Sequence, residues 1–258
     1  GKIKPDKEFP YGLKERLAMY DRKTAEHLKR QKNIWIHTVS IGEFLSITPL
    51  IQKLKKEDKN NIVITFATKT GRRVAEKKFP DIKCLFFPVD TYPVIKNAIK
   101  KIKPQLIVIV ETELWPNLLY IAHKQKIPVV LINGRISPFS YPKYKMIRCF
   151  SRMILPLFSA ITMRTEEEAE KLIYLGADRN KIEVVGSIKF DLAYEMSKTV
   201  HPEGVRESLG IEKERRIVIF GSLHPEEEEP IIEIAEKLLK QFQDILIVIV
   251  PRYLDRTR

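Results

Sequence analysis

The segment LIVIVETELWPN at residues 106–117 decides the fold class. Its first five residues are an unbroken run of Leu, Ile and Val, which is typical of a β-strand buried on both faces. Two acidic residues follow, and then Pro116, which favours the first turn of a helix. The segment therefore predicts a buried strand that passes through a short acidic loop into a helix.

The same alternation of strand and helix recurs on both sides of this segment. Short β-branched runs predict strands at residues 34–39, 62–66, 84–87, 106–110, 129–132, 160–163 and 182–185. Amphipathic stretches between them predict helices at residues 43–56, 70–79, 93–101, 114–124 and 165–174. For the last helix, Thr165 and Glu168 form a capping-box pattern, and Gly176 follows its end. This order predicts an α/β fold whose parallel sheet is covered by helices on both faces.

The pattern changes after residue 189. Residues 190–215 are polar and predict a connection with at most short helices. A second unit then begins, with a strand at 217–220, a turn at 221–225, a helix at 226–243 and a strand at 245–250. We predict four parts: a basic helical segment (1–32), a complete doubly wound domain (33–189), the connection (190–215) and the start of a second domain (216–258). Because one βαβ crossover does not close its own core, we expect the chain to be cut short at its C-terminus, and the missing Met suggests the same of its N-terminus.

The composition excludes several classes of protein. With 44% hydrophobic and 31% charged residues in 258, the chain has enough apolar side chains for a core, which excludes global disorder. No apolar run approaches the roughly 20 residues of a membrane-spanning helix. Cys84 and Cys149 have no paired spacing, which excludes a disulfide scaffold or a zinc ribbon and fits a reducing cytosol. The net charge of +13 predicts an anionic partner.

The positive charge is concentrated in two regions. Residues 1–32 contain ten Lys and Arg against five acids, and residues 114–165 contain eight basic residues and no acid. Within the second region, residues 138–146 (PFSYPKYKM) mix aromatic, proline and lysine side chains. This pattern fits a solvated face, or a surface that meets anionic head groups or phosphates. Single-stranded nucleic acid is a weaker alternative, because no RNP, KH or zinc-finger signature is present.

The segments that follow two of the predicted strands contain more polar side chains than a simple connecting loop requires. The first is residues 37–43 (HTVSIGE), which end in Glu43. We interpret Glu43 either as a general base or as an acid that complements the helix dipole. Gly42, just before it, permits a tight turn and the close approach of a ligand. The second is the pair Glu111 and Glu113. If their strand continues, their side chains point to opposite sides of it and one of them faces a cleft. The alternative is that both are simply acids at the start of a helix.

A third set consists of residues 185–191 (VGSIKFD), 221–224 (GSLH) and Pro251-Arg252. Gly-Ser turns offer N–H groups to a phosphate, and Arg252 can pair with it. No GxGxxG or GxxxxGK[ST] motif occurs, which argues against a dehydrogenase and a P-loop NTPase. The five histidines lack metal-ligand spacing, so we predict no metal and no cofactor.

In order and spacing, residues 37–43, 111–117, 164–167, 175–177 and 186–191 resemble the 3-deoxy-D-manno-octulosonic acid (Kdo) transferases of lipid A biosynthesis. Residues 221–224 and 250–252 extend the resemblance into the second unit. The resemblance implies a GT-B architecture of two Rossmann-like domains. It also implies metal-free, inverting transfer of Kdo from CMP-Kdo to a hydroxyl of a phosphorylated lipid A precursor, lipid IVA.

The resemblance also implies roles for individual residues. Glu43 would be the general base and Glu111 a second essential carboxylate, while Lys189, Ser222, His224 and Arg252 would bind the donor. For the acceptor we predict six residues: Ser40, Gly42, Arg135, Lys143, Lys145 and Arg148. The sequence departs from the family pattern at Pro225-Glu226 and Tyr253, and it lacks the family's later donor-binding segment. We therefore expect this chain alone to be inactive.

The resemblance implies an anionic membrane surface as a further partner, at the cytoplasmic face of the bacterial inner membrane, and no nucleic acid. Two alternatives stay open from the sequence. One is another GT-B sugar-nucleotide enzyme, either a transferase or an epimerase. The other is a basic module without enzymatic activity that binds anionic lipid or nucleic acid.

Overall fold

The computed structural model describes residues 12–29, 33–56, 61–198 and 200–252. The chain divides into two compact units, Gly1–Glu195 and Met196–Arg258. Residues 1–11 and 30–32 of the predicted basic segment, and the departure at Tyr253, lie outside the described residues.

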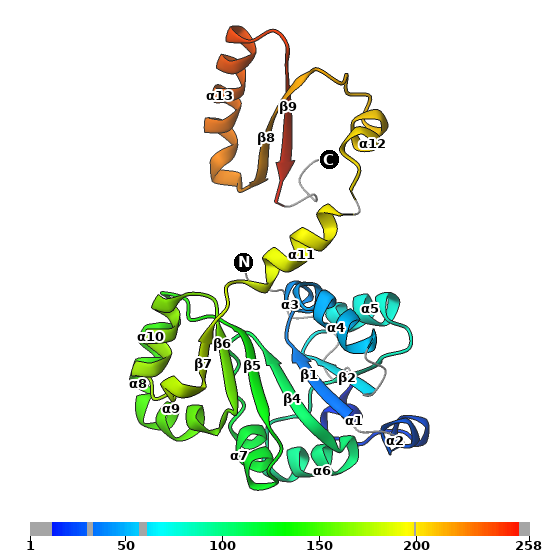
Figure 1. Ribbon diagram of the computed structural model, residues 1–258, viewed down its shortest axis with the longest axis vertical. Helices are drawn as coiled ribbons and strands as arrows, with labels where there is room; N and C mark the ends of the chain where they lie inside the picture. Colours follow the sequence, from blue (N-terminus) through cyan, green and yellow to red (C-terminus); the bar gives the residue numbers. More distant parts are fainter. Residues whose placement is uncertain (1–11, 30–32, 57–60, 199, 253–258) are drawn as a thin grey trace. The chain divides into compact units, whose positions relative to one another are not determined.

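The first unit is built on a parallel sheet of seven strands (Figure 1). The strands are β1 (Asn33–Thr38), β2 (Asn61–Phe66), β3 (Lys83–Phe86), β4 (Pro104–Val110), β5 (Val129–Gly134), β6 (Ala160–Met163) and β7 (Ile182–Val184). Their order across the sheet is β3-β2-β1-β4-β5-β6-β7, and every neighbouring pair is parallel. The chain winds outward from β1 to β3 and then returns to β4, so β1 and β4 form the switch point at which α/β sheets bind ligands.

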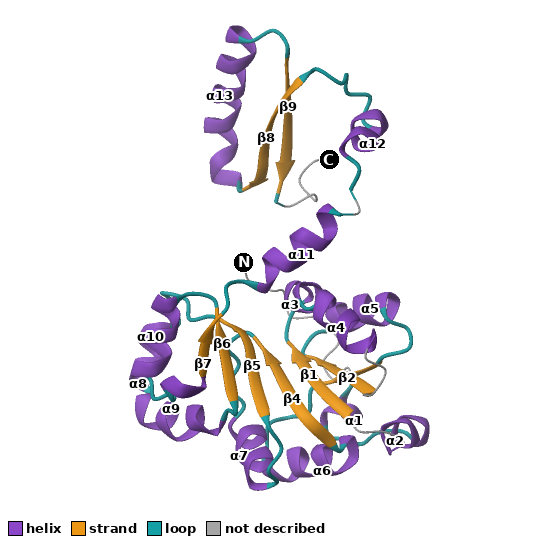
Figure 2. Ribbon diagram, viewed as in Figure 1, coloured by secondary structure: helices purple, strands orange, loops and turns teal. Residues whose placement is uncertain are grey.

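Helices connect the strands and cover both faces of this sheet (Figure 2). The α-helices are α1 (Leu13–Arg16), α2 (Arg22–Lys29), α3 (Ile41–Ser46), α4 (Thr48–Lys56), α5 (Lys69–Lys78), α6 (Tyr92–Ile102), α7 (Pro116–Lys124), α8 (Tyr141–Met146), α9 (Arg148–Ile154), α10 (Glu166–Tyr174) and α11 (Ile188–Ser197). Two short 3₁₀ helices are η1 (Leu155–Leu157) and η2 (Arg179–Lys181). The predicted α/β fold with a doubly covered parallel sheet is confirmed.

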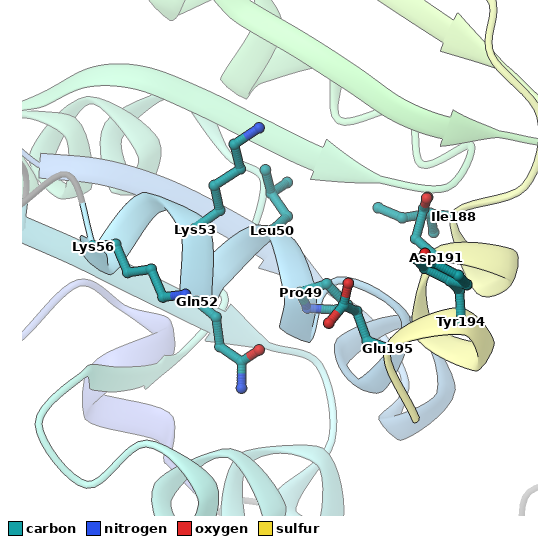
Figure 3. Close-up of a pocket in the computed structure, with 9 residues that line it drawn as sticks. All are labelled: Pro49, Leu50, Gln52, Lys53, Lys56, Ile188, Asp191, Tyr194 and Glu195. Atoms are coloured by element: carbon teal, nitrogen blue, oxygen red, sulfur yellow. The ribbon is translucent and has the colours of Figure 1, made fainter. Parts of the chain in front are cut away.

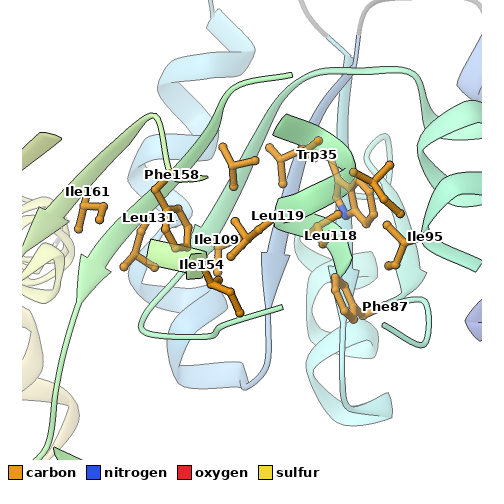
Figure 4. Close-up of a cluster of buried hydrophobic side chains, with 14 of the residues drawn as sticks. Trp35, Phe87, Ile95, Ile109, Leu118, Leu119, Leu131, Ile154, Phe158 and Ile161 are labelled. Atoms are coloured by element: carbon orange, nitrogen blue, oxygen red, sulfur yellow. The ribbon is translucent and has the colours of Figure 1, made fainter. Parts of the chain in front are cut away.

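The hydrophobic core consists of two clusters, one on each face of the sheet. Successive residues of β1 alternate between them: Ile34 and Ile36 join the cluster with α3, α4 and α5, whereas Trp35 joins the cluster with α6, α7 and α10 (Figure 4). Trp35 is fully buried, and its Nε1 donates to Thr65 Oγ1 at 2.9 Å. Truncating such a side chain to Ala costs about 3–5 kcal/mol.

The helices differ from the prediction in two places, for local reasons. The helix predicted at residues 43–56 is two helices, α3 and α4, separated at Ile47. Pro49 has no N–H to donate to Leu45, so the first helix stops and a second begins with Pro49 in its first turn. Helices α8 and α9 were not predicted, because the proline and aromatic residues of 138–146 hide any helical period.

The second unit contains one parallel βαβ crossover. Its elements are α12 (Pro202–Ser208), β8 (Arg216–Leu223), η3 (Pro225–Glu227), α13 (Glu228–Gln241) and β9 (Ile245–Pro251), and β8 pairs with β9. The turn predicted to begin at Gly221 is wrong, because β8 continues to Leu223. A register shift between Gly221 and Leu223 accommodates Ser222, whose φ is 62°.

The division between the units falls near the end of α11, between Glu195 and Met196. Residues 190–215 therefore include most of α11 and all of α12. The domain boundaries at residues 33, 189 and 216 stay predictions.

Candidate active site

Glu43 lies at the start of α3, directly after β1. Ser40 caps this helix, since its Oγ accepts from the Glu43 N–H at 3.2 Å. The Glu43 carboxylate in turn accepts from the Val39 N–H at 2.7 Å and from Ser40 Oγ at 3.0 Å. The arrangement is close to a capping box, and it holds a half-buried carboxylate in one orientation. The structural role that the sequence offered as an alternative for Glu43 is therefore real.

The electrostatics of Glu43 also suit a proton acceptor. Burial raises the pKa of its carboxyl above the usual value, and the negative charge of Glu111 adds to the rise. The hydrogen bonds from Val39 and Ser40 act in the opposite direction. A carboxylate with a raised pKa is a stronger base than an exposed one.

Glu111 and Glu113 lie after β4, the strand next to β1. The strand ends at Val110, and Glu111 adopts a φ of 60°, so the chain turns here instead of continuing as a strand. The turn is closed by the Glu113 N–H, which donates to the Glu111 carbonyl at 3.0 Å. The predicted alternation of the two side chains across a continuing strand therefore does not apply.

Glu113 belongs to the same acidic cluster, although the sequence analysis did not select it as a site residue. Burial raises the pKa of its carboxyl to about 7, with further contributions from the charges of Glu43 and Glu111. Because β1 and β4 are parallel neighbours, the segments that follow them bring the three acids to the same edge of the sheet. The signal was present in the ETE motif, but it is recognisable only once the chain is seen to turn at Glu111.

Asn117 in the same motif has a structural role. Asp90 accepts hydrogen bonds from the backbone N–H groups of Asn117 and Leu118 at 3.0 and 2.9 Å, and so caps α7. The Asn117 side chain donates to the Asp90 carbonyl at 2.7 Å.

His37, in β1, is fully buried. Its ring stacks on Phe87 at 3.9 Å between centroids and meets the edge of Trp115 at 5.6 Å. Burial lowers its pKa to about 3, so this histidine is neutral at ordinary pH.

Of the predicted acceptor residues, Ser40 and Arg135 lie beside the carboxylates. Ser40 binds Glu43 directly, and the Arg135 N–H donates to Thr112 Oγ1, between the two acids of the loop, at 2.8 Å. Gly42 is exposed within α3 without a positive φ, and a Cβ there would meet only Ser40 Oγ, at 3.8 Å. The tight turn predicted for Gly42 is therefore wrong.

The other three predicted acceptor residues lie on α8 and α9. Lys143 lies over the ring of Phe139 at 4.2 Å, Lys145 over Tyr141 at 5.4 Å and Arg148 over Tyr174 at 3.9 Å. Tyr144 links α8 to the acidic loop, because its hydroxyl donates to the Thr112 carbonyl at 3.5 Å. Burial and the charge of Glu113 raise the Tyr144 pKa.

The predicted donor residues are divided between the two units. In the second unit, Arg252 Nη1 donates to Ser222 Oγ at 3.4 Å, and His224 caps η3 by donating its N–H to Glu227 at 2.8 Å. Lys189 is an exposed residue of α11 in the first unit.

A hollow of about 520 Å³ lies between α4 and α11 (Figure 3). It does not include Glu43, Glu111 or Glu113. Lys53 and Lys56 contribute from α4, and Asp191, Tyr194 and Glu195 from α11. None of the predicted site residues lines it. Within the described ranges, no group of three His, Cys, Asp or Glu side chains is arranged to hold a metal ion. None of the described helices is both long and apolar enough to cross a bilayer.

The sequence profile of the family described as 3-deoxy-D-manno-octulosonic-acid transferase (kdotransferase) matches residues 11–192. The chain belongs to this family. The match contains every predicted site residue of the first unit, including Glu43, Glu111 and Lys189.

Curated relatives support the same assignment. The chain is 32% identical to the 3-deoxy-D-manno-octulosonic acid transferase of Rickettsia typhi, over 88% of this chain and 48% of that protein. For the enzyme of the same name from Haemophilus influenzae the identity is 30%, over 87% and 53%. A bifunctional glycosyltransferase/methyltransferase of Fusobacterium nucleatum is 34% identical, over 95% and 38%. The chain therefore spans about half the length of the curated relatives it matches.

Solved structures confirm the predicted GT-B type of fold. The UDP-GlcNAc 2-epimerase of Neisseria meningitidis superposes with a TM-score of 0.61 at 17% identity, over 84% of this chain and 64% of that one. The enzyme of Methanocaldococcus jannaschii gives 0.58 at 18%, over 84% and 65%. At these identities the likeness concerns the fold alone.

Proposed function

We propose that this chain supplies the acceptor side of an enzyme that transfers Kdo from CMP-Kdo to a hydroxyl of a phosphorylated lipid A precursor, lipid IVA. The observation that supports the proposal is the cluster of Glu43, Glu111 and Glu113 at the switch point between β1 and β4. The cluster lies within the part of the chain that matches the Kdo transferase family.

Glu43 is the proposed general base. The acceptor hydroxyl attacks the anomeric carbon of Kdo and forms the new C–O bond while its proton passes to Glu43. The bond from the anomeric carbon to the CMP phosphate breaks, the electron pair leaves with CMP, and the configuration inverts. Because a sugar hydroxyl is a weak nucleophile, a base already fixed in position lowers the barrier.

The other two carboxyls influence how readily Glu43 accepts this proton. With a pKa of about 7, Glu113 is protonated in a large fraction of molecules at neutral pH, whereas each ionised neighbour makes the proton on Glu43 more favourable. In the second unit, Ser222, His224 and Arg252 are the proposed contacts of the donor phosphate, where Arg252 would offset the growing negative charge of the departing CMP. Lys189 is proposed as a further donor contact.

We further propose that the protein works on an anionic membrane surface, the cytoplasmic face of the bacterial inner membrane. Helices α8 and α9 support this, because they expose apolar side chains next to lysine and arginine. Met146 of α8 is 87% exposed, Met153 of α9 66%, and Phe139, two residues before α8, 76%. A surface with this combination of apolar and basic residues is suited to the head-group region of an anionic bilayer.

The experiment uses the complete protein that contains this chain. Radiolabelled CMP-Kdo and a tetraacylated, phosphorylated disaccharide are supplied, and labelled lipid is measured. The expected result is transfer of label to the lipid. Absence of transfer by a folded protein that binds CMP would overturn the proposed reaction.

A further inference from the structure

Two side chains at the carboxyl ends of β5 and β6 carry buried donor groups that the described part of the chain does not satisfy. Asn133 is 2% exposed, and its Nδ2 has no hydrogen-bond partner. Arg164, directly after β6, has a buried Nη1 without a partner. Leaving a buried donor unpaired is unfavourable, so such groups call for an explanation, and a ligand that supplies the acceptor is one.

The geometry around Asn133 fixes the direction of its amide. The residue is the last but one of β5 and has a φ of 54°, and its own N–H donates to Thr162 Oγ1 at 3.1 Å. Its Oδ1 accepts from the N–H of Ile188, the first residue of α11, at 3.3 Å. Because the oxygen must face that N–H, Nδ2 is the free end of the amide beside the start of α11, where the helix dipole favours an anion.

Arg164 lies next to Asn133 in the sheet. Its backbone N–H donates to the Gly134 carbonyl at 3.3 Å, so the two residues follow adjacent strands. The described residues include no ion pair of its guanidinium group. A half-buried guanidinium N–H without an acceptor favours a carboxylate or a phosphate over any neutral ligand.

These donors lie on the same edge of the sheet as the acidic cluster. The Glu111 N–H donates to the Ile132 carbonyl at 2.9 Å, which places Glu111 beside Asn133. Arg164 is one strand farther, so its backbone is roughly 10 Å from that of Glu111 by the usual strand spacing. In Figure 2 these strands end on the side of the sheet from which α11 leaves.

We propose that Asn133 and Arg164 bind the carboxylate of the sugar acid that is transferred, an inference that rests on the proposed function. In a 2-ulosonic acid this carboxylate is bonded to the anomeric carbon, so holding it places the reacting carbon within reach of Glu43. The three carboxyls of the site would repel a fourth, and Arg164 supplies the compensating positive charge. Both are positioning residues, since they hold the substrate and do not move a proton.

The test compares donor and acceptor kinetics of the complete protein. Arg164→Gln removes the charge, and Asn133→Asp keeps the acceptor for the Ile188 N–H while removing the donor. Each variant is expected to raise the KM for CMP-Kdo about 10- to 100-fold, the effect of losing a charge-assisted hydrogen bond. The KM for the lipid acceptor and the Kd for CMP, which lacks the carboxylate, should not change. Arg179→Gln is the matched control, an exposed arginine paired with Glu170.

Several outcomes would overturn the inference. One is an unchanged KM for CMP-Kdo in both variants, with melting temperatures equal to that of the parent. Another is a rise confined to the KM for the lipid, which would assign the donors to a phosphate of the acceptor. If the parent protein transfers no sugar, the proposed function fails, and calorimetric titration with free Kdo then tests the carboxylate site by itself. Weaker binding of Kdo by Arg164→Gln than by the parent supports the site. Equal binding by both proteins refutes it.

Discussion

Glu43 has a structural role at the start of α3, and substitution can separate this role from the chemical one proposed for it. In Glu43→Gln the amide oxygen still accepts from the Val39 N–H, so α3 keeps its cap, but the side chain no longer takes a proton. We expect kcat of the complete protein to fall about 10²- to 10⁴-fold, the usual contribution of a general base. The KM for both substrates should change little, because the cap holds the loop in place.

The measurement is transfer of labelled Kdo, with a melting curve for each variant. Glu183→Gln is the control, because Glu183 is an exposed residue of β7 with its side chain in solvent. A Glu43→Gln protein that keeps more than half of the parent kcat would show that another group takes the proton.

Glu113 makes the stability of the first unit depend on pH. Its pKa is raised from 4.5 to about 7 on folding, so between these values the folded state holds more protons than the unfolded state. Stability therefore falls as pH rises from about 4.5 to 7, and the full loss, on the order of 1–3 kcal/mol, is present above pH 7.

Glu113→Gln abolishes this dependence, because an amide does not ionise. We expect the variant to melt several degrees higher than the parent at pH 8 and at about the same temperature at pH 4.5. Glu183→Gln serves as the control with no such difference. Equal melting temperatures of Glu113→Gln and the parent at pH 8 would mean that the Glu113 carboxylate is not destabilising.

At the level of elements, α8 and α9 are the surface on which membrane binding is expected to depend. Lys143→Glu with Lys145→Glu places two acids next to Phe139 and Met146 without altering the contact between Arg148 and Tyr174. Each basic residue near an anionic bilayer contributes about 1 kcal/mol, so binding should weaken at least tenfold. The measurement is co-sedimentation with vesicles of phosphatidylglycerol and phosphatidylethanolamine at 0.1 M salt.

Lys77→Glu with Lys78→Glu is the matched control, because it changes the net charge equally at the exposed end of α5. If both pairs weaken binding equally, the attraction depends on net charge and α8 is only a solvated face.

The elements also show how far the sequence predicts this molecule. Each strand in the described ranges is predicted, because each contains a short run of β-branched and apolar residues such as 106–110. Helices were less certain where prolines interrupt the pattern, as at Pro49 and in α8. For the site, the motifs predict Glu43 and Glu111. The positions of the Glu113 and Asn133 side chains depend on backbone turns with positive φ, at Glu111 and at Asn133 itself. Local composition does not specify such turns.

At the level of the whole molecule, the two units differ in how well they bury their apolar side chains. In the first unit β1 is flanked by β2 and β4 and is entirely buried, whereas in the second Ile219 is 64% exposed and Ile249 48%. A two-stranded sheet with one covered face is marginally stable in water. We expect amide protons of β8 and β9 to exchange at least 100-fold faster than those of β1 and β4 in this 258-residue chain.

Hydrogen–deuterium exchange followed by mass spectrometry measures this difference, with peptides from both units in one sample. The first unit is the internal control. Equal protection of β8 and β1 would contradict the expectation and show that the second unit is held by contacts beyond its own crossover.

The cap that joins Glu43 to Val39 and Ser40 has a consequence for selectivity. Both oxygens of the carboxylate already accept hydrogen bonds from their own loop, so their remaining lone pairs face a restricted set of directions. As the proposed general base, Glu43 would take a proton only from an acceptor hydroxyl that approaches along one of these directions. If Glu43 is the general base proposed above, the start of a six-residue helix would select which hydroxyl of a sugar reacts.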